Sequence, residues 1–200
     1  MSRRRIVLAS TSVWRRAQLE RLGLTFETAD PAVDEDAAKA AHPEVAELVD
    51  VLARAKARAV ATAYPDALVI GGDQAAEIDG AELGKPGAPD RAVAQLLRLQ
   101  GRAHHLWTAV CVLDTATDEA WTHVERTRLT MRALTPGQAR RYVALDDPVS
   151  CAGSYRIEAT GPALFTRIEG DDPTAIEGLP LLVLCELLRR AGHDVLGDAP

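Results

Sequence analysis

Apolar runs and amphipathic stretches alternate along most of the chain. Residues 6–9 form a short apolar run, and the hydroxyl residues after it stand where a helix over residues 14–22 needs its N-cap. Apolar residues at helical spacing predict a long helix over residues 44–64. A continuous apolar run at residues 67–70 and a mostly apolar stretch at 106–113 predict buried strands, the first of which ends shortly before an aspartate.

The second half of the chain continues this mixture. Residues 120–133 alternate apolar and charged side chains, as a half-exposed strand does. Residues 153–168 are predicted to form a hairpin that turns near Gly161. Three more helices are predicted: over residues 90–99, from Thr135 onward behind a capping hydroxyl and a proline, and over residues 180–190. Strands and helices that intermingle in this way predict an α/β fold with a central sheet.

Composition places the chain among ordinary globular proteins and argues against several functions. Its 200 residues carry 23 Lys and Arg against 29 Asp and Glu, and this net charge of −6 disfavours binding to nucleic acid or to an acidic membrane surface. No stretch approaches the roughly 20 apolar residues that a membrane span needs. Because the sequence has no repeat and no linker-like segment, we expect residues 1–200 to form a single domain with short flexible ends at 1–4 and 196–200.

The cysteines indicate a reducing environment. Cys111, Cys151 and Cys185 form no Cys-x-x-Cys pair and have no histidine at zinc-ligand spacing, so we expect neither a zinc site nor a disulfide framework. This cysteine usage predicts a cytoplasmic protein.

Lys56 and Asp73 are the strongest candidates for chemistry. Lys56 lies on the apolar face of its predicted helix, where either its stem packs while the ammonium reaches water, or the ammonium projects into a cleft to meet an anion. Asp73 follows the apolar run at 67–70, where an aspartate can cap a turn, bind a metal or accept a proton from water.

Other polar residues suit an anionic ligand. Ser10 and Arg15 flank a predicted helix N-terminus, an arrangement that binds phosphate, although capping alone also explains the hydroxyl. Lys85 adds a cation in a Gly-Lys-Pro turn that lacks the spacing of a Walker loop. Glu35 lies in an acidic triplet, residues 34–36, whose simpler interpretation is a solvated loop rather than a metal site.

Several motifs together make the chain resemble the Maf family of nucleoside triphosphate pyrophosphatases over nearly its whole length. In chain order they are Leu8-Ala9-Ser10-Thr11-Ser12 with Trp14-Arg15-Arg16, Val33-Asp34-Glu35, Ala55-Lys56-Ala57, Gly71-Gly72-Asp73-Gln74, Leu83-Gly84-Lys85-Pro86, Cys151-Ala152-Gly153-Ser154-Tyr155 and Glu177-Gly178-Leu179-Pro180-Leu181. An ordered set of this kind is far harder to meet by chance than any one of its members.

The resemblance implies a single elongated mixed-sheet α/β body of the Maf and inosine triphosphatase type, with two lobes that flank a nucleotide cleft, and a homodimer. It also implies hydrolysis of a nucleotide between its α- and β-phosphates with the help of a divalent cation, Mg²⁺, Mn²⁺ or Co²⁺. Asp73 would accept the proton of the attacking water and, with Glu35, hold the metal. The residues that would surround the triphosphate are Ser10, Arg15, Lys56 and Lys85.

Three positions resemble the branch of the family that acts on 7-methyl-GTP rather than on dTTP and UTP. Gln74 follows Asp73 where the pyrimidine branch has threonine, Trp14 stands in the opening motif, and Glu158 follows the Cys-Ala-Gly motif. Methylated guanine carries positive charge, so the Trp14 ring face and the Glu158 carboxylate suit it. The alternative for Trp14 is a helix residue that closes the core.

Two other functions stay open on the sequence alone. The first alternative is an enzyme of the dTTP and UTP branch. The second is a non-catalytic, nucleotide-sensing regulator of cell division that binds a protein or DNA partner. The complete set of acidic and basic residues argues against lost catalysis, and the net charge of −6 argues against DNA.

Overall fold

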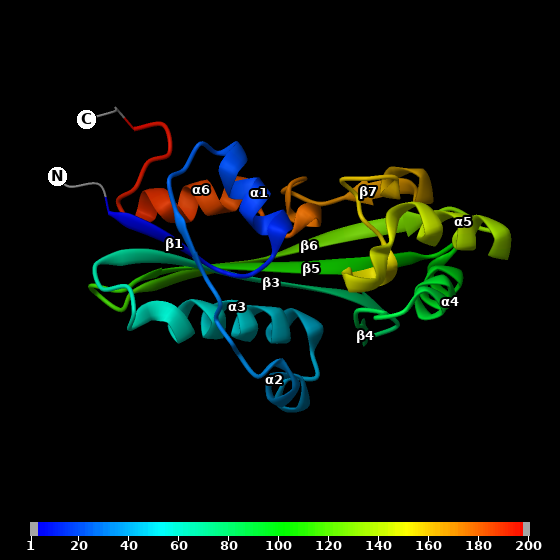
Figure 1. Cartoon of the computed structure of the whole chain (residues 1–200), viewed down its shortest axis with the longest axis horizontal. Helices are drawn as coiled ribbons and strands as arrows, with labels where there is room; N and C mark the ends of the chain where they lie inside the picture. The colour runs from blue at the N-terminus through cyan, green and yellow to red at the C-terminus, as the bar shows by residue number, and fades with distance from the viewer. Residues whose placement is uncertain (1–3, 198–200) are drawn as a thin grey trace.

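The computed structural model of this chain describes residues 4–197. Most of the predicted flexible ends fall on residues 1–3 and 198–200, which lie outside the described residues. Figure 1 shows an elongated molecule in which long strands run along the main axis, and the described part of the chain begins and ends on the same side.

One mixed sheet organises the molecule. Its strands are ordered β2-β1-β3-β5-β6-β7, with β4 paired to β3 outside this path. The β1–β2 and β1–β3 pairs are parallel, and the other pairs are antiparallel. The strands are β1 (Arg5–Ala9), β2 (Glu27–Ala29), β3 (Ala67–Ile78), β4 (Ala81–Leu83), β5 (Ala103–Asp114), β6 (Ala120–Met131) and β7 (Phe165–Glu169). The predicted α/β class with a mixed sheet is therefore confirmed.

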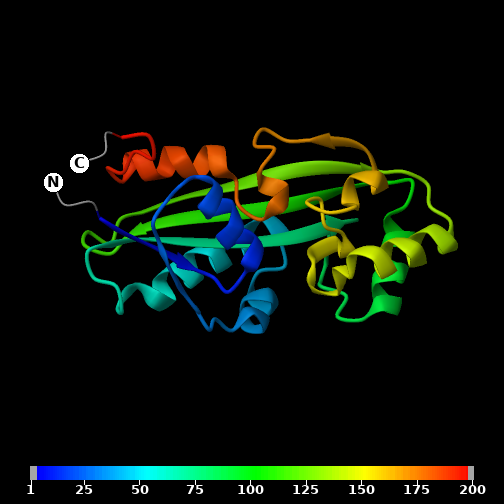
Figure 2. The same ribbon diagram turned by 45° about the horizontal axis from the view of Figure 1, so that its top comes forward.

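Helices cover the sheet differently at its two ends. At one end α1 and α6 lie on one face and α3 lies on the other, while α4 and α5 pack together at the far end (Figures 1 and 2). The helices are α1 (Val13–Arg21), α2 (Glu35–Ala41), α3 (Val45–Ala61), α4 (Pro89–Leu99), α5 (Pro136–Asp146) and α6 (Leu181–Arg190). The long strands β3, β5 and β6 connect these two lobes.

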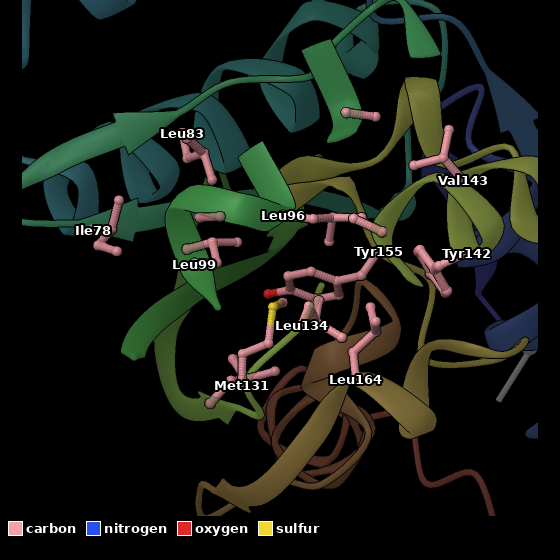
Figure 3. Close-up of a cluster of buried hydrophobic side chains, with 14 of the residues drawn as sticks. Ile78, Leu83, Leu96, Leu99, Met131, Leu134, Tyr142, Val143, Tyr155 and Leu164 are labelled. Carbon is pink, nitrogen blue, oxygen red and sulfur yellow. The ribbon is translucent and has the colours of Figure 1, made fainter. Parts of the chain in front are cut away.

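Buried side chains form three clusters that follow this division. One lies between the sheet and α1 with α6, and a second lies between the sheet and α3. The third fills the far lobe around α4 and α5, and Figure 3 shows the Tyr155 ring in the middle of its labelled side chains. Each lobe thus has its own apolar core, and the strands that cross between them are common to both.

α3 approaches β3 unusually closely at Gly71. A Cβ atom at this position would lie 2.1 Å from the Ala53 carbonyl oxygen and 2.9 Å from the Ala57 backbone nitrogen. No side chain fits there, so only glycine allows the helix to rest directly on the strand.

The structure corrects three of the predicted elements. β3 does not stop at residue 70 but continues to Ile78, so Asp73 lies within a strand rather than after one. The hairpin predicted over 153–168 is wrong, because Gly153 and Ser154 both have left-handed φ values and the segment forms 3₁₀ turns before β7. Residues 34–36 are not a loop, because Asp34 caps α2 and accepts hydrogen bonds from two backbone N–H groups of its first turn.

Within residues 4–197, no helix has the length and apolar character needed to cross a membrane.

Replacing Gly71 with alanine is expected to destabilise the protein by about 1–3 kcal/mol or more, because α3 must move away from β3 to admit the methyl group. Urea unfolding followed by circular dichroism measures the change. The control is Gly84→Ala, because nothing lies within 4 Å of a Cβ there and no left-handed φ is required; its effect should stay within about 0.5 kcal/mol. Equal effects at both positions would contradict the close contact.

Candidate active site

A cleft opens where β3 lacks a neighbour on one edge. β1 pairs with β3 as far as Gly71, and β4 pairs with it from Ala76, so residues 72–75 face a gap between the lobes. A cavity of about 400 Å³ lies at this gap, and a hollow of about 410 Å³ adjoins it beside the start of α1. This size suits a small-molecule ligand.

Lys56 and Asp73 meet at the floor of the cleft. Successive strand residues point to opposite faces, so Asp73 points to the same side as Gly71, toward α3. The close approach at Gly71 brings the helix near enough for Lys56 Nζ to lie 2.6 Å from Asp73 Oδ1. Only 7% of Lys56 and 8% of Asp73 is exposed. The Lys56 ammonium therefore does not reach out to water but binds carboxylates in the cleft.

Glu35 completes this charge cluster from α2. Its Oε1 atom lies 2.6 Å from Lys56 Nζ, so a single ammonium joins the two carboxylates. Partial burial raises the pKa of Glu35, but its hydrogen bond to Lys56 and the charges of Lys56, Lys85 and Lys39 lower it, and the net shift is downward. Glu35 is thus held ionised at the cleft.

The start of α1 supplies hydrogen-bond donors and a second cation. Arg15 Nε donates to the Gly178 carbonyl at 3.1 Å, and its Nη1 lies 3.5 Å from Ser10 Oγ. Ser12 caps the helix through a hydrogen bond from the Arg15 backbone N–H. Partial burial lowers the pKa of Arg15, while Asp73 and Glu35 oppose this shift. Arg15 is therefore a fixed guanidinium that faces the carboxylates.

Lys85 reaches the cleft from the other lobe. It is exposed, and among residues 4–197 it has no salt bridge, so its charge is available to a ligand. The turn that carries it is held by Gln95, whose Nε2 donates to the Gly84 carbonyl at 2.8 Å. Gln95 Oε1 accepts a hydrogen bond from Ser154 Oγ, which links this turn to the 151–155 segment.

Trp14, Gln74 and Glu158 also line the cavity. Trp14 belongs to none of the three buried clusters, so it does not close the core. Gln74 Nε2 donates to Thr108 Oγ1 at 3.0 Å and to the carbonyl of Ala175 at 2.9 Å. These contacts occupy the amide nitrogen and leave the amide oxygen for a ligand.

The structure brings all the residues singled out in the sequence to one place. The cavity or its adjoining hollow is lined by Ser10, Trp14, Arg15, Glu35, Lys56, Asp73, Gln74, Lys85 and Glu158.

Comparison with known proteins shows the family of the chain. A family profile described as "Maf-like protein" matches residues 5–191. The chain belongs to the Maf family. Among its relatives, a protein named 7-methyl-GTP pyrophosphatase from Cupriavidus pinatubonensis is 43% identical over 94% of each chain. A protein of the same name from Xanthomonas campestris is 45% identical over 96% of this chain and 98% of its own.

The carboxylates of this Maf protein suit a hard divalent cation. Among the described residues, no group of three or more His, Cys, Asp or Glu side chains is arranged to hold a metal ion. Mg²⁺, however, usually takes only one or two protein carboxylates and completes its shell with water and substrate phosphates. Glu35 and Asp73, which share Lys56, provide such a pair of oxygen donors.

Sequence reasoning missed several residues at the Maf cleft. Lys39 and Glu82 form an ion pair of 2.9 Å between α2 and β4, Gln95 holds the Lys85 turn, and Arg156 stacks on Trp14. Each acts through a partner far away in the chain. No local motif could have identified them.

The Glu35–Lys56 pair predicts an acid-dependent change in the stability of this Maf protein. Because the pKa of Glu35 is lowered in the folded state, its contribution is present above the ordinary value of 4.5 and is lost as the pH falls through the folded value. The difference in unfolding free energy between wild type and Glu35→Gln should therefore disappear on acidification. Urea unfolding between neutral and acid pH measures it.

The control for this prediction is the same comparison in a Lys56→Met background, where the main cation that lowers the Glu35 pKa is gone. A Glu35→Gln difference that does not change with pH, or one that survives unaltered without Lys56, would contradict the assignment.

Proposed function

We propose that this Maf protein hydrolyses 7-methyl-GTP to 7-methyl-GMP and pyrophosphate. The observation that carries the proposal is the buried Lys56–Asp73 pair at the gap in the β3 edge, with two further cations on opposite sides of the same cleft. Relatives with 43–45% identity over nearly their whole length are named for this activity.

Asp73 is the proton acceptor in this proposal. Lys56 contacts its Oδ1 atom and fixes the carboxylate, and Oδ2 is the oxygen that we assign to the proton of water. The water oxygen forms a bond to the α-phosphorus while the bond from that phosphorus to the oxygen bridging the α- and β-phosphates breaks. Pyrophosphate leaves with the electron pair of the broken bond.

The cations of the cleft stabilise the charge that develops in this step. Arg15 uses Nε to hold the Gly178 carbonyl, so its remaining N–H groups can bind a phosphate. Lys85 approaches from the far lobe, Lys56 lies on the floor, and Ser10 adds a hydroxyl. Negative charge grows on the attacked phosphoryl oxygens and on the leaving pyrophosphate, where these groups act.

Glu35 and Asp73 are the residues that would hold a divalent cation, Mg²⁺, Mn²⁺ or Co²⁺. When bound, such an ion neutralises phosphate charge and polarises the phosphoryl oxygens. In the free protein the Lys56 ammonium holds the same two carboxylates together. The chain therefore keeps the two ligands close to one another before substrate arrives.

The base is recognised by charge and by one amide. The positive charge of 7-methylguanine suits the Trp14 ring face and the Glu158 carboxylate. The Gln74 amide oxygen is free to accept a hydrogen bond from a base N–H, because its amide nitrogen is occupied by Thr108 and Ala175. Threonine at this position has a shorter side chain, so its hydroxyl would not extend as far into the cleft toward the base as the Gln74 amide does.

The rival assignments differ in measurable ways. An enzyme of the dTTP and UTP branch would use the same floor with another base preference. A regulator without catalysis would not need the Lys56–Asp73 pair, and the net charge of −6 disfavours DNA as its partner. Residues 1–200 acting as a single domain, the cytoplasmic location and the homodimer stay predictions.

A substrate panel with an Asp73→Asn variant tests the proposal. With Mg²⁺ or Mn²⁺, wild type should release pyrophosphate rather than orthophosphate, and faster from 7-methyl-GTP than from GTP, CTP, UTP or dTTP. Asp73→Asn keeps the shape of the side chain but removes the base, so turnover should fall by about 10²–10⁴-fold. Circular dichroism of the variant checks that the fold is retained.

The outcomes separate the alternatives. Preference for UTP or dTTP would support the reaction but reject 7-methylguanine as the recognised nucleobase. No turnover of any nucleotide would favour a non-catalytic regulator. Wild-type turnover by Asp73→Asn would mean that Asp73 is not the proton acceptor.

A further inference from the structure

We propose that Arg156 is a positioning residue that fixes the Trp14 ring and the Glu158 carboxylate, from the two sides of the cleft, in the arrangement that a cationic base requires. The inference rests on the proposed function for its substrate, but the contacts that support it belong to the free protein.

Arg156 is anchored firmly to the far lobe. Its backbone N–H donates to the Tyr142 hydroxyl at 2.9 Å, and its Nη1 donates to the Asp146 carbonyl at 2.9 Å. Tyr142 is 5% and Asp146 6% exposed, so both partners are buried residues of α5. The guanidinium thus projects from a fixed position on the far lobe.

From this anchored position Arg156 reaches the opposite lobe. Its Cζ atom lies 4.3 Å from the centre of the Trp14 ring, well within the range of a cation–π contact, and Trp14 stands in the first turn of α1. Its Nε atom donates to Glu158 Oε1 at 3.3 Å. One guanidinium therefore contacts two of the three residues assigned to the base.

Trp14 depends on this contact for its orientation. It is 36% exposed and packs in none of the buried clusters, so no apolar core fixes its side-chain rotamer. The planar guanidinium covers the ring without lining the cavity, whereas Trp14 and Glu158 do line it. Arg156 thus supports both side chains from behind and leaves them available to the ligand.

This placement predicts an effect on base binding rather than on the chemical step. The hydrogen bond to Glu158 uses Oε1, which leaves the second carboxylate oxygen for the base. Among residues 4–197, Arg156 forms no hydrogen bond or salt bridge with Lys56, Asp73 or Arg15, the charged groups at the floor of the cleft. Loss of the guanidinium should therefore raise KM and weaken base discrimination while kcat changes little.

The test compares Arg156→Met and Arg156→Lys with wild type. Methionine keeps an unbranched stem but removes charge and planarity, whereas lysine keeps the stem and the charge and removes only the planar guanidinium. Arg156→Met should raise KM for 7-methyl-GTP by roughly threefold to thirtyfold, from the usual strength of a cation–π contact. Its kcat should stay within about twofold, its preference over GTP should decrease, and Arg156→Lys should lie between.

The matched control is Arg189→Met. Arg189 also pairs with a carboxylate, that of Glu186, but it is exposed on α6 and does not line the cavity. This variant should leave KM and kcat unchanged.

A second readout needs no substrate. Acrylamide quenching of tryptophan fluorescence in the free protein reports the freedom of Trp14, and a Trp14→Phe variant identifies its share among the three tryptophans. Quenching of Trp14 should increase in Arg156→Met and be restored in part by Arg156→Lys.

The two proposals fail separately. A wild type without preference for 7-methyl-GTP rejects the proposed substrate, whatever Arg156 does. Unchanged Trp14 quenching in Arg156→Met rejects the positioning role on any substrate. A lower KM in Arg156→Met would also overturn it, because the guanidinium would then compete with the base for Trp14 and Glu158.

Discussion

The structure depends on the burial of one charged side-chain group, the ammonium of Lys56. A buried lysine is stable only when its charge is matched, and Lys56 meets this demand with Asp73 and Glu35, each 2.6 Å away. The match requires α3 to lie directly on β3, which the absence of a side chain at Gly71 allows. It also requires α2, because Glu35 stands in the first turn of that helix. Packing and charge are therefore set by the same contact.

The sheet turns this contact into a cleft. β3 runs through both lobes, and its edge is covered by β1 at one end and by β4 at the other, so the central residues stay open. The carboxylate of Asp73 lies on a rigid strand, while the cations and the base-binding residues come from elements on either side. A ligand that bridges the lobes would thus contact the strand at the floor and side chains from both lobes.

The sequence predicted the centre of the site better than its periphery. Lys56 is visible because a lysine interrupts the apolar face of a long helix, and Asp73 because it follows a buried run. α2 was missed because none of its side chains is buried, so it has no apolar periodicity. The error over 153–168 has another cause, since Ser154 adopts a left-handed φ that its residue type does not announce. The contact of Arg156 with Trp14 joins segments that lie far apart in the chain, and it exists only once the fold has brought them together.

Attack of water at the α-phosphorus is the step that we propose for these residues. It is tested most directly by a single turnover of 7-methyl-GTP in isotopically labelled water, with mass spectrometry of both products. If Asp73 directs water to the α-phosphorus, the heavy oxygen will appear in 7-methyl-GMP and the pyrophosphate will carry none. Label in pyrophosphate, or release of labelled orthophosphate, would mean attack at another phosphorus and would contradict this role for the Lys56–Asp73 pair.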